Sequence, residues 1–327
     1  MAISTIYPSH ERTSEQWKKL FGTGGTVTMR LCRGWLLFLL LLCLMAPCQA
    51  VARPPDFTTK NVRFPSAGVT LAGTLFKPKH PYAAVVIVYG SGQEKRMTEF
   101  AALLASNGLA VLTYDKRGVG ESGGVYAGPE VGTNNIDAAN LDLLAADASA
   151  AADALAAHLP ARQGPVGLVG FSQAGWVIPL AATKNQMVRF LVLFSGPVIT
   201  AREQLRFQFF TEGKANFWEM HTEAEAREHL RNDPDRYQFA DTDARDALTT
   251  LSIPGLWLFG GQDVQVPVVL SIEHLDALKA QGKPYQYRLF PTLGHNTAAS
   301  REPVDAAIEW IKATGGRAKR KTSRAKG

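Results

Sequence analysis

Residues 166–175 read Val-Gly-Leu-Val-Gly-Phe-Ser-Gln-Ala-Gly, and the fold is decided by this stretch. A short apolar run ends at Gly170, the chain then presents Ser172, and the residues after Gly175 are compatible with a helix. This order predicts a strand, a tight turn and a helix. A turn of this kind raises a serine hydroxyl above the carboxyl end of a parallel sheet, and it needs small neighbours because its backbone is strained and closely packed.

The stretch therefore predicts a nucleophilic serine at Ser172. The usual pattern is Gly-x-Ser-x-Gly, whereas here Ala174 takes the place of the second glycine and Gly175 follows it. Alanine is small enough for such a turn. A purely structural strand-to-helix turn is the alternative, so the assignment depends on partner residues elsewhere in the chain.

The composition indicates a globular protein of enzyme size. The chain has 327 residues, of which 46% are hydrophobic, enough for one α/β domain of roughly 250–280 residues with extensions. The formal net charge is +6, but residues 1–52 and 311–327 are basic while the body between them is net acidic. This distribution argues against a nucleic-acid-binding fold.

Residues 29–52 have the layout of a secretory signal peptide. A short basic segment at 29–33 precedes an unbroken apolar run at 35–45, and small residues at 50–52 supply a cleavage site. The apolar run is short for a bilayer span. We therefore expect an exported protein, either periplasmic or secreted.

Residues 1–28 add nothing to this layout, so we expect that the true start is Met29 and that 1–28 is a misassigned upstream extension. Two alternatives would leave the protein on the membrane: an uncleaved signal anchor, or lipidation at Cys48. All three cysteines lie in the same segment, so the mature chain would contain none. That excludes a disulfide framework, a thiol nucleophile and a Cys-x-x-Cys metal site.

The remaining chain alternates between strand and helix patterns, which predicts one α/β domain over residues 53–314 with a parallel sheet and helices on both faces. Strand-like runs lie at 61–64, 69–76, 83–89, 109–114, 166–169, 188–194, 255–259 and 285–290, the first two forming a hairpin. Helical patterns lie at 97–107, 135–159, 268–281 and 303–311.

Two segments break this alternation. Residues 196–251 are rich in charged and aromatic side chains and contain no strand-like run. They predict a helical cap over the strand ends, with a plain surface excursion as the alternative. Residues 315–327 are polar and basic without hydrophobic periodicity, which predicts a disordered tail able to make a weak contact with an anionic surface.

The partners that Ser172 needs follow two later strands. A serine hydroxyl becomes a good nucleophile only when a histidine accepts its proton and a carboxylate orients that histidine. Asp263 lies in Gly-Gln-Asp-Val-Gln-Val-Pro after one buried strand, and His295 lies in Leu-Gly-His-Asn after the next. Loops that leave the same edge of a sheet converge above it, so the sequence predicts a triad in the order Ser172, Asp263, His295.

These features together resemble the α/β-hydrolase superfamily over roughly residues 57–311. The loop Asp115-Lys-Arg-Gly-Val-Gly-Glu-Ser122 is similar to the Asp-x-Arg-Gly-x-Gly-x-Ser loop common in these enzymes. The strongest likeness is to exported serine esterases and serine aminopeptidase-like hydrolases whose third strand ends in Gly-Ser-Gly, here Gly90-Ser-Gly92. Tyr89 departs from the histidine that many members have. The resemblance implies an α/β-hydrolase fold, with a mostly parallel eight-stranded sheet, helices on both faces and a small helical cap.

The resemblance also implies an oxyanion hole made of two backbone N–H groups. One belongs to Gln173 and the other to Ser91, with Gly92 as the alternative to Ser91. Gly90 and Gly92 allow the loop backbone to approach the serine closely. Donors placed in this way stabilise the negative charge of a tetrahedral intermediate.

The other polar candidates are expected to be structural. Asp115 and Arg117 fix their loop, and the histidines other than His295 lie at the surface or in structural positions. No spacing of His, Asp or Glu predicts a metal, and the glycine-rich loops lack the Lys-Ser/Thr ending of a phosphate loop, so we expect neither metal nor cofactor.

The sequence therefore predicts a serine hydrolase that cleaves a carboxylic ester of a small molecule through an acyl-enzyme. Two alternatives remain open: an aminopeptidase-like amide hydrolase acting on a short peptide-like substrate, and a non-catalytic binding protein with the same fold. An aminopeptidase would need a carboxylate for the substrate amine. The cap offers four candidates for it: Glu212, Glu219, Glu223 and Glu225.

Overall fold

The computed structural model describes residues 56–127, 135–160, 164–234 and 238–324. The predicted upstream extension and signal peptide lie outside the described residues. Within these ranges, no helix combines the length and the apolar character needed to cross a bilayer.

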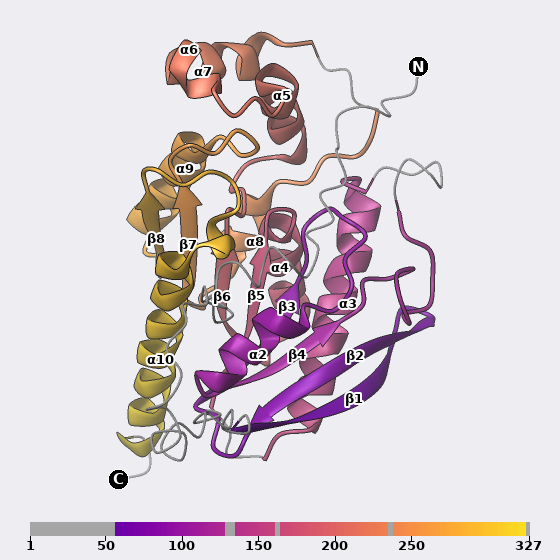
Figure 1. Ribbon diagram of the computed structural model, residues 1–327. Helices are drawn as coiled ribbons and strands as arrows, with labels where there is room; N and C mark the ends of the chain where they lie inside the picture. The colour runs from indigo at the N-terminus through magenta and orange to yellow at the C-terminus, as the bar shows by residue number, and fades with distance from the viewer. Residues whose placement is uncertain (1–55, 128–134, 161–163, 235–237, 325–327) are drawn as a thin grey trace, which may run out of the picture. The chain divides into compact units, whose positions relative to one another are not determined.

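The described chain is built on one eight-stranded sheet, in the order β1-β2-β4-β3-β5-β6-β7-β8 (Figure 1). β2 pairs antiparallel with both β1 and β4, and every other pairing is parallel. The predicted fold class is therefore confirmed. The strands are β1 Phe57–Ser66, β2 Val69–Pro78, β3 Ala83–Val88, β4 Leu109–Tyr114, β5 Val166–Phe171, β6 Val188–Phe194, β7 Gly255–Gly260 and β8 Tyr285–Phe290.

Helices cover both faces of the sheet (Figure 1). One face carries α2 (Thr98–Ser106) and α10 (Arg301–Arg324). The other carries α3 (Ala138–Ala157), α4 (Ala174–Lys184), α8 (Ala244–Thr250) and α9 (Val268–Ala280). Every residue of β3, β4 and β7 is buried, which explains their continuous apolar runs, because a strand covered on both sides has no solvent face.

The helical cap is smaller than the sequence predicted. It lies between β6 and β7, beyond the carboxyl ends of the strands, and consists of α5 (Ala201–Thr211), α6 (Phe217–Met220) and α7 (Glu223–Asn232) (Figure 1). The predicted limits of 196–251 were too wide, because the segment on either side supplies apolar side chains to the main core. These residues are Val198, Phe239, Ala244, Leu248 and Leu251.

The cap has a small apolar core of its own. Buried Phe207, Ala226 and Leu230 pack with the partly buried Phe210 and Trp218. The aromatic rings are in contact: the Phe207 and Trp218 centroids lie 6.1 Å apart. Most cap aromatics therefore stabilise the cap, since burying a large apolar side chain contributes about 1.5–3 kcal/mol.

The C-terminal segment also differs from the expected disordered tail at 315–327. α10 continues to Arg324, past Gly315 and Gly316. Alanine, lysine and arginine are strong helix formers, so the backbone continues as a helix although each glycine costs about 1 kcal/mol relative to alanine. Residues 325–327 lie outside the described part of the chain.

Candidate active site

Ser172 lies on a sharp turn between β5 and α4. Its φ is +48°, in the left-handed region that side-chain-bearing residues rarely adopt. Its N–H donates to the Phe194 carbonyl at the end of β6, at 3.0 Å. A left-handed residue costs roughly 1–2 kcal/mol, so the turn holds this serine in a strained position at the carboxyl edge of the sheet.

Close packing around Ser172 explains why the residues beside it are small. A Cβ on Gly170 would lie 2.5 Å from the Ala174 Cβ and 2.8 Å from the Val88 carbonyl oxygen. A Cβ on Gly175 would lie 2.4 Å from Cδ of Pro197 and 2.6 Å from its nitrogen. At both positions a Cβ would clash with backbone atoms and with packed side chains that have no room to move. The turn therefore requires glycine at each.

Asp263 and His295 come from the loops that follow β7 and β8. Asp263 Oδ2 lies 2.8 Å from His295 Nδ1, while Oδ1 accepts hydrogen bonds from the N–H groups of Gln265 and Val266 at 2.7 and 3.0 Å. The carboxylate is fully buried, and the histidine side chain is 18% exposed. The aspartate thus shapes its own loop and orients the imidazole, so that Nε2 is the ring nitrogen available for proton transfer.

The end of β6 contacts both the serine turn and the histidine loop. Ser172 is bonded to Phe194, and the next residue, Ser195, donates through Oγ to the His295 carbonyl at 2.5 Å. Among the described residues, no hydrogen bond joins Ser172 Oγ to His295. Serine–histidine hydrogen bonds are commonly long in the absence of substrate and tighten when it binds.

Ser195 contacts the loop of the candidate histidine, and the sequence analysis did not single it out. It is 1% exposed, its φ is +51°, and its Oγ also lies 3.1 Å from Thr297 Oγ1. Thr297 in turn donates to the Leu258 carbonyl of β7 at 3.1 Å. The sequence held a clue to its position at the sheet edge, because Ser195 directly follows an apolar strand, as Ser172 does.

The backbone groups predicted to form the oxyanion hole lie beside Ser172. A Cβ on Gly90 would be 3.7 Å from the Ser172 Cβ, so the loop after β3 contacts the serine turn. Among the described residues, the N–H groups of Ser91, Gly92 and Gln173 have no acceptor. The Gln173 N–H also precedes the first turn of α4, where a helix dipole favours negative charge.

The loop after β3 is anchored at both ends on β4. Tyr89 OH lies 2.7 Å from Thr113 Oγ1 and accepts a hydrogen bond from the Tyr114 N–H at 2.9 Å. Met97 N–H donates to the same Thr113 oxygen at 2.8 Å. Burial raises the pKa of Tyr89 above its ordinary value, so the phenol stays neutral. The tyrosine that departs from the family pattern therefore fixes the start of this loop.

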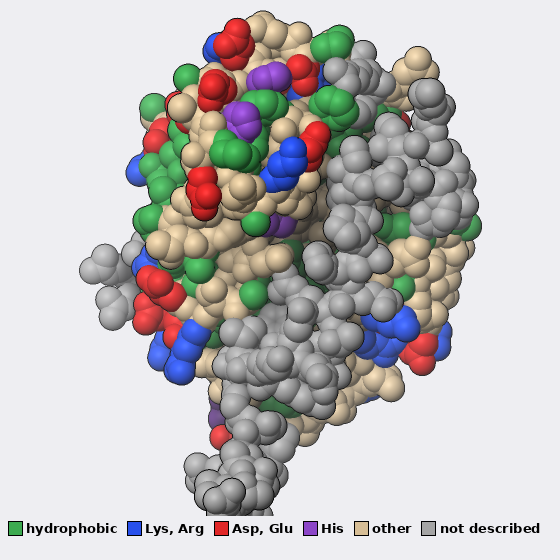
Figure 2. Space-filling view, turned by 45° about the horizontal axis from the view of Figure 1, so that its top comes forward, with side chains coloured by type: hydrophobic (Ala, Val, Ile, Leu, Met, Phe, Trp, Pro, Cys, Tyr) green, Lys and Arg blue, Asp and Glu red, His purple; other side chains and the backbone are tan. Residues whose placement is uncertain are grey.

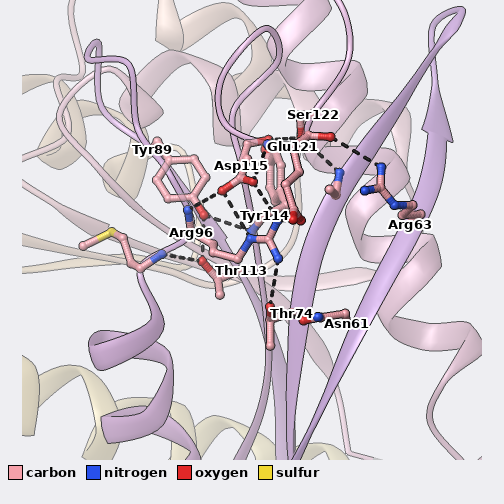
Figure 3. Close-up of polar contacts among 12 residues, drawn as sticks. Asn61, Arg63, Thr74, Tyr89, Arg96, Thr113, Tyr114, Asp115, Glu121 and Ser122 are labelled. Carbon is pink, nitrogen blue, oxygen red and sulfur yellow. Dashed lines mark hydrogen bonds and ion pairs between the residues drawn. The ribbon is translucent and has the colours of Figure 1, made fainter.

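Asp115, at the end of β4, accepts several hydrogen bonds (Figure 3). The Arg96 guanidinium lies between Asp115 and Glu121, at 2.7 and 2.5 Å from their carboxylates. Burial opposes ionisation of Asp115, but the hydrogen bonds from Arg96 and from the Glu121 N–H outweigh it, so its pKa lies below the usual value. Arg117 forms a separate buried ion pair with Asp147 at 2.5 Å. Both loop residues have the structural partners expected of them.

The cap contacts the loop that carries Asp263. Trp218 Nε1 donates to the Asp263 carbonyl at 2.9 Å, and Thr211 Oγ1 donates to the Val264 carbonyl at 2.7 Å. These bonds join the cap to the backbone of the aspartate whose side chain orients His295. The position of the cap and the position of the candidate acid are therefore linked.

The remaining polar candidates are engaged or exposed. Over the upper part of Figure 2, acidic and basic side chains are interspersed with histidines. Within the described ranges, no group of three His, Cys, Asp or Glu side chains is arranged to hold a metal ion. Three of the four cap carboxylates interact with neighbouring residues: Glu212 with Lys214, Glu223 with Arg227 and Glu225 with Thr222. The fourth, Glu219, is exposed.

Comparison with known proteins gives the same fold. A family model described as "Serine aminopeptidase, S33" matches residues 79–234, which include Ser172 and end before Asp263. An esterase of Pyrococcus furiosus is 17% identical, with a TM-score of 0.57 over 81% of this chain and 91% of that one. No curated protein matches the sequence.

Two further structures have similar folds. A dienelactone hydrolase from Anabaena variabilis is 19% identical, with a TM-score of 0.52 over 79% of this chain and 96% of that one. An acylaminoacyl peptidase from Pyrococcus horikoshii is 17% identical, with a TM-score of 0.54, and the match covers 76% of this chain but only 39% of the peptidase.

The sheet order, the serine turn after β5 and the paired carboxylate and histidine after β7 and β8 define a hydrolase-type α/β fold. The chain has the α/β-hydrolase fold, and part of it, residues 79–234, is similar to the serine aminopeptidase family.

Proposed function

We propose that the protein is a serine hydrolase that cleaves a carboxylic ester of a small molecule through an acyl-enzyme. The observation that carries this proposal is the 2.8 Å contact between Asp263 Oδ2 and His295 Nδ1, at the same sheet edge as the strained Ser172. A buried carboxylate paired with one nitrogen of an imidazole prepares the other nitrogen to act as a base.

In the proposed reaction, Ser172 Oγ attacks the ester carbonyl while His295 Nε2 accepts the serine proton. Asp263 stabilises the imidazolium that forms. The N–H groups of Gln173 and of Ser91 or Gly92 stabilise the oxyanion. His295 then protonates the leaving alcohol. A water molecule next attacks the acyl-enzyme while His295 accepts its proton, and His295 returns that proton to Ser172 Oγ as the bond between Oγ and the acyl group breaks and the acid is released. The proposal requires no cofactor or metal.

An amide substrate is the second candidate, because the family model that matches residues 79–234 describes serine aminopeptidases. Recognition of a free amine would need a carboxylate near the serine. Glu212, Glu223 and Glu225 already interact with Lys214, Arg227 and Thr222. Glu219 is exposed, so the cap keeps one candidate for this role, and the comparison of ester with anilide hydrolysis decides between the two substrates.

The test is covalent labelling of residues 53–327 by a fluorophosphonate probe, together with hydrolysis of short p-nitrophenyl esters and aminoacyl anilides. Ser172→Ala should abolish both labelling and turnover. Ser106→Ala, at an exposed serine at the end of α2, is the control and should keep both. Faster hydrolysis of anilides than of esters would favour the aminopeptidase. A folded wild type that neither labels nor turns over would support a binding protein instead.

Export to the periplasm or the medium is a further part of the proposal, and it rests on the pattern of residues 29–52 alone. A weak contact of the basic residues after 315 with an anionic surface is proposed on charge alone. Fractionation of cells expressing the full chain, with N-terminal sequencing of the product, tests cleavage near residue 52.

A further inference from the structure

A lysine that the proposed reaction does not use lies in the interior beside the site. Lys116 follows β4 and is 4% exposed, although an ammonium group in the protein interior loses much favourable hydration. Burial lowers the pKa of Lys116 to about 7, and the nearby Glu94 only partly opposes this effect. A lysine is almost never fully buried unless it is paired, so the contacts of this side chain are informative.

Lys116 Nζ joins the two segments that carry the proposed oxyanion donors. It donates to the Gly90 carbonyl at 2.7 Å and to the Gly92 carbonyl at 3.3 Å, both in the loop after β3. It also donates to Gln173 Oε1, at 3.1 Å, on the residue that follows Ser172. The three donors of one ammonium group are therefore all used between these two segments.

These contacts determine which way the loop N–H groups point. In a planar trans peptide, the carbonyl and the following N–H point in opposite directions, and the described chain contains no cis peptide. Holding the Gly90 carbonyl therefore directs the Ser91 N–H away from Lys116. The Ser91 carbonyl accepts hydrogen bonds from Tyr126 OH and, at 3.0 Å, from Asn135 Nδ2, which orients the Gly92 N–H in the same manner.

The Gln173 side chain completes the connection. Its Oε1 accepts from Lys116, and its Nε2 donates to the Asn135 carbonyl at 2.7 Å. Gln173 is 2% exposed, and its backbone N–H is the second proposed oxyanion donor. A side chain held at both ends limits the movement of the backbone that carries it.

We propose that Lys116 is a positioning residue for the oxyanion hole, because its ammonium group fixes the loop at Gly90–Gly92 relative to Gln173. This inference rests on the proposed function, since an oxyanion forms only if Ser172 attacks a carbonyl. Lys116 acts through the backbone and does not touch the substrate. Its removal should weaken transition-state stabilisation more than substrate binding, because the two donors must be aligned where the charge develops.

The test compares Lys116→Met with wild type. Methionine has a similar length but no charge and no donor. We expect kcat for a short p-nitrophenyl ester to fall about 10- to 100-fold, below the loss typical of deleting an oxyanion donor outright. KM should stay within about threefold. A trifluoromethyl ketone, which forms a tetrahedral adduct, should lose affinity in proportion to kcat.

Two further variants separate positioning from a general effect. Lys116→Gln keeps an N–H₂ donor on a side chain one atom shorter, so it should recover part of the kcat that Lys116→Met loses. Lys283→Met is the matched control, because Lys283 Nζ also donates to a backbone carbonyl, that of Leu251, at 3.1 Å, but precedes β8 at the opposite end of the strands. It should keep wild-type kcat.

Thermal unfolding followed by circular dichroism distinguishes this role from a structural one. Lys116→Met removes a buried charge but leaves its acceptors unpaired, two effects that oppose each other, so its midpoint should stay close to that of wild type. The inference would be overturned if Lys116→Met kept the kcat and the inhibitor affinity of the wild type. It would also be overturned if neither Lys116→Met nor Lys116→Gln folded. A wild type without labelling or turnover would instead refute the proposed function, and the inference with it.

Discussion

Ser195 offers a sharp test of how the histidine loop is held. Its Oγ donates to the His295 carbonyl at 2.5 Å and contacts Thr297 Oγ1 at 3.1 Å. Its φ of +51° makes two substitutions informative. Ser195→Ala removes the hydroxyl and keeps the strain, whereas Ser195→Gly removes the hydroxyl and relieves the strain.

The two variants should differ in stability. Losing the hydroxyl removes one of the two donors to the His295 carbonyl, which keeps the Thr297 N–H at 3.0 Å, so the loss should be about 0.5–1.5 kcal/mol. Ser195→Ala should therefore unfold at a temperature lower by about 1–6 °C. In Ser195→Gly, relief of a left-handed residue returns roughly 1 kcal/mol, so its stability should lie within about 1 kcal/mol of wild type.

Their activities should nevertheless be equal. If the hydroxyl positions His295, both variants lose it and both should lose kcat by about tenfold, because small displacements of a catalytic group reduce the rate strongly. Urea unfolding and kcat for a p-nitrophenyl ester measure the two quantities. A kcat loss confined to the less stable Ser195→Ala, or wild-type kcat in either variant, would refute the positioning of His295 by Ser195. Thr183→Ala, which removes an exposed hydroxyl, is the control.

Three other predictions follow from buried contacts. Gly175→Ala places a Cβ 2.4 Å from Pro197 Cδ; it should cost about 1–3 kcal/mol of stability in urea unfolding and abolish fluorophosphonate labelling, and normal labelling would contradict the steric argument. Asp147→Ala leaves the Arg117 charge buried without its partner, so unfolding should become easier by about 3–5 kcal/mol; a loss below 1 kcal/mol would show that Arg117 finds another acceptor. The pKa of Asp115 is depressed in the folded state, so the ionised carboxylate should add to the free energy of unfolding above the unfolded pKa of about 4, and this stabilisation should disappear as the pH falls further. Asp115→Asn should lose that part of the pH dependence of stability. A urea unfolding profile of Asp115→Asn that matches wild type between pH 2 and 5 would disprove it.

The triad order was predictable because each residue lies close after an apolar strand run. Ser172, Asp263 and His295 occupy loops after β5, β7 and β8, and the carboxyl ends of parallel strands share one edge. Periodicity and turn residues in the sequence are sufficient to find such positions. The structure adds the 2.8 Å contact between Asp263 and His295, while the catalytic role of these residues stays a prediction.

Lys116 and Ser195 were not predictable in the same way. Lys116 lies in a polar loop, Asp-Lys-Arg-Gly, where a lysine is ordinarily solvated. Its burial depends on Gly90 and Gln173, which come from two distant segments, and on Tyr126 further along its own loop. Nothing in the local sequence distinguishes a solvated ammonium from one that bonds to two loops.

The limits of the cap and of the last helix were also misjudged. Phe239 and Leu248 join the main core rather than the cap, and α10 extends to Arg324. The high charge of these segments gave no sign of this. A segment rich in charge can still supply a few apolar side chains to a neighbouring core. Which core receives them depends on packing.

By itself, the sequence determined the α/β alternation, the order of the candidate triad and the sharp turn at Ser172, because strand periodicity, glycine placement and apolar runs are local properties. The tertiary structure alone decided that Lys116 joins the loop after β3 to Gln173, that Ser195 donates to the His295 carbonyl, and where the cap ends. Those features depend on burial and on distances between residues far apart in the chain, which arise only when the sheet has assembled.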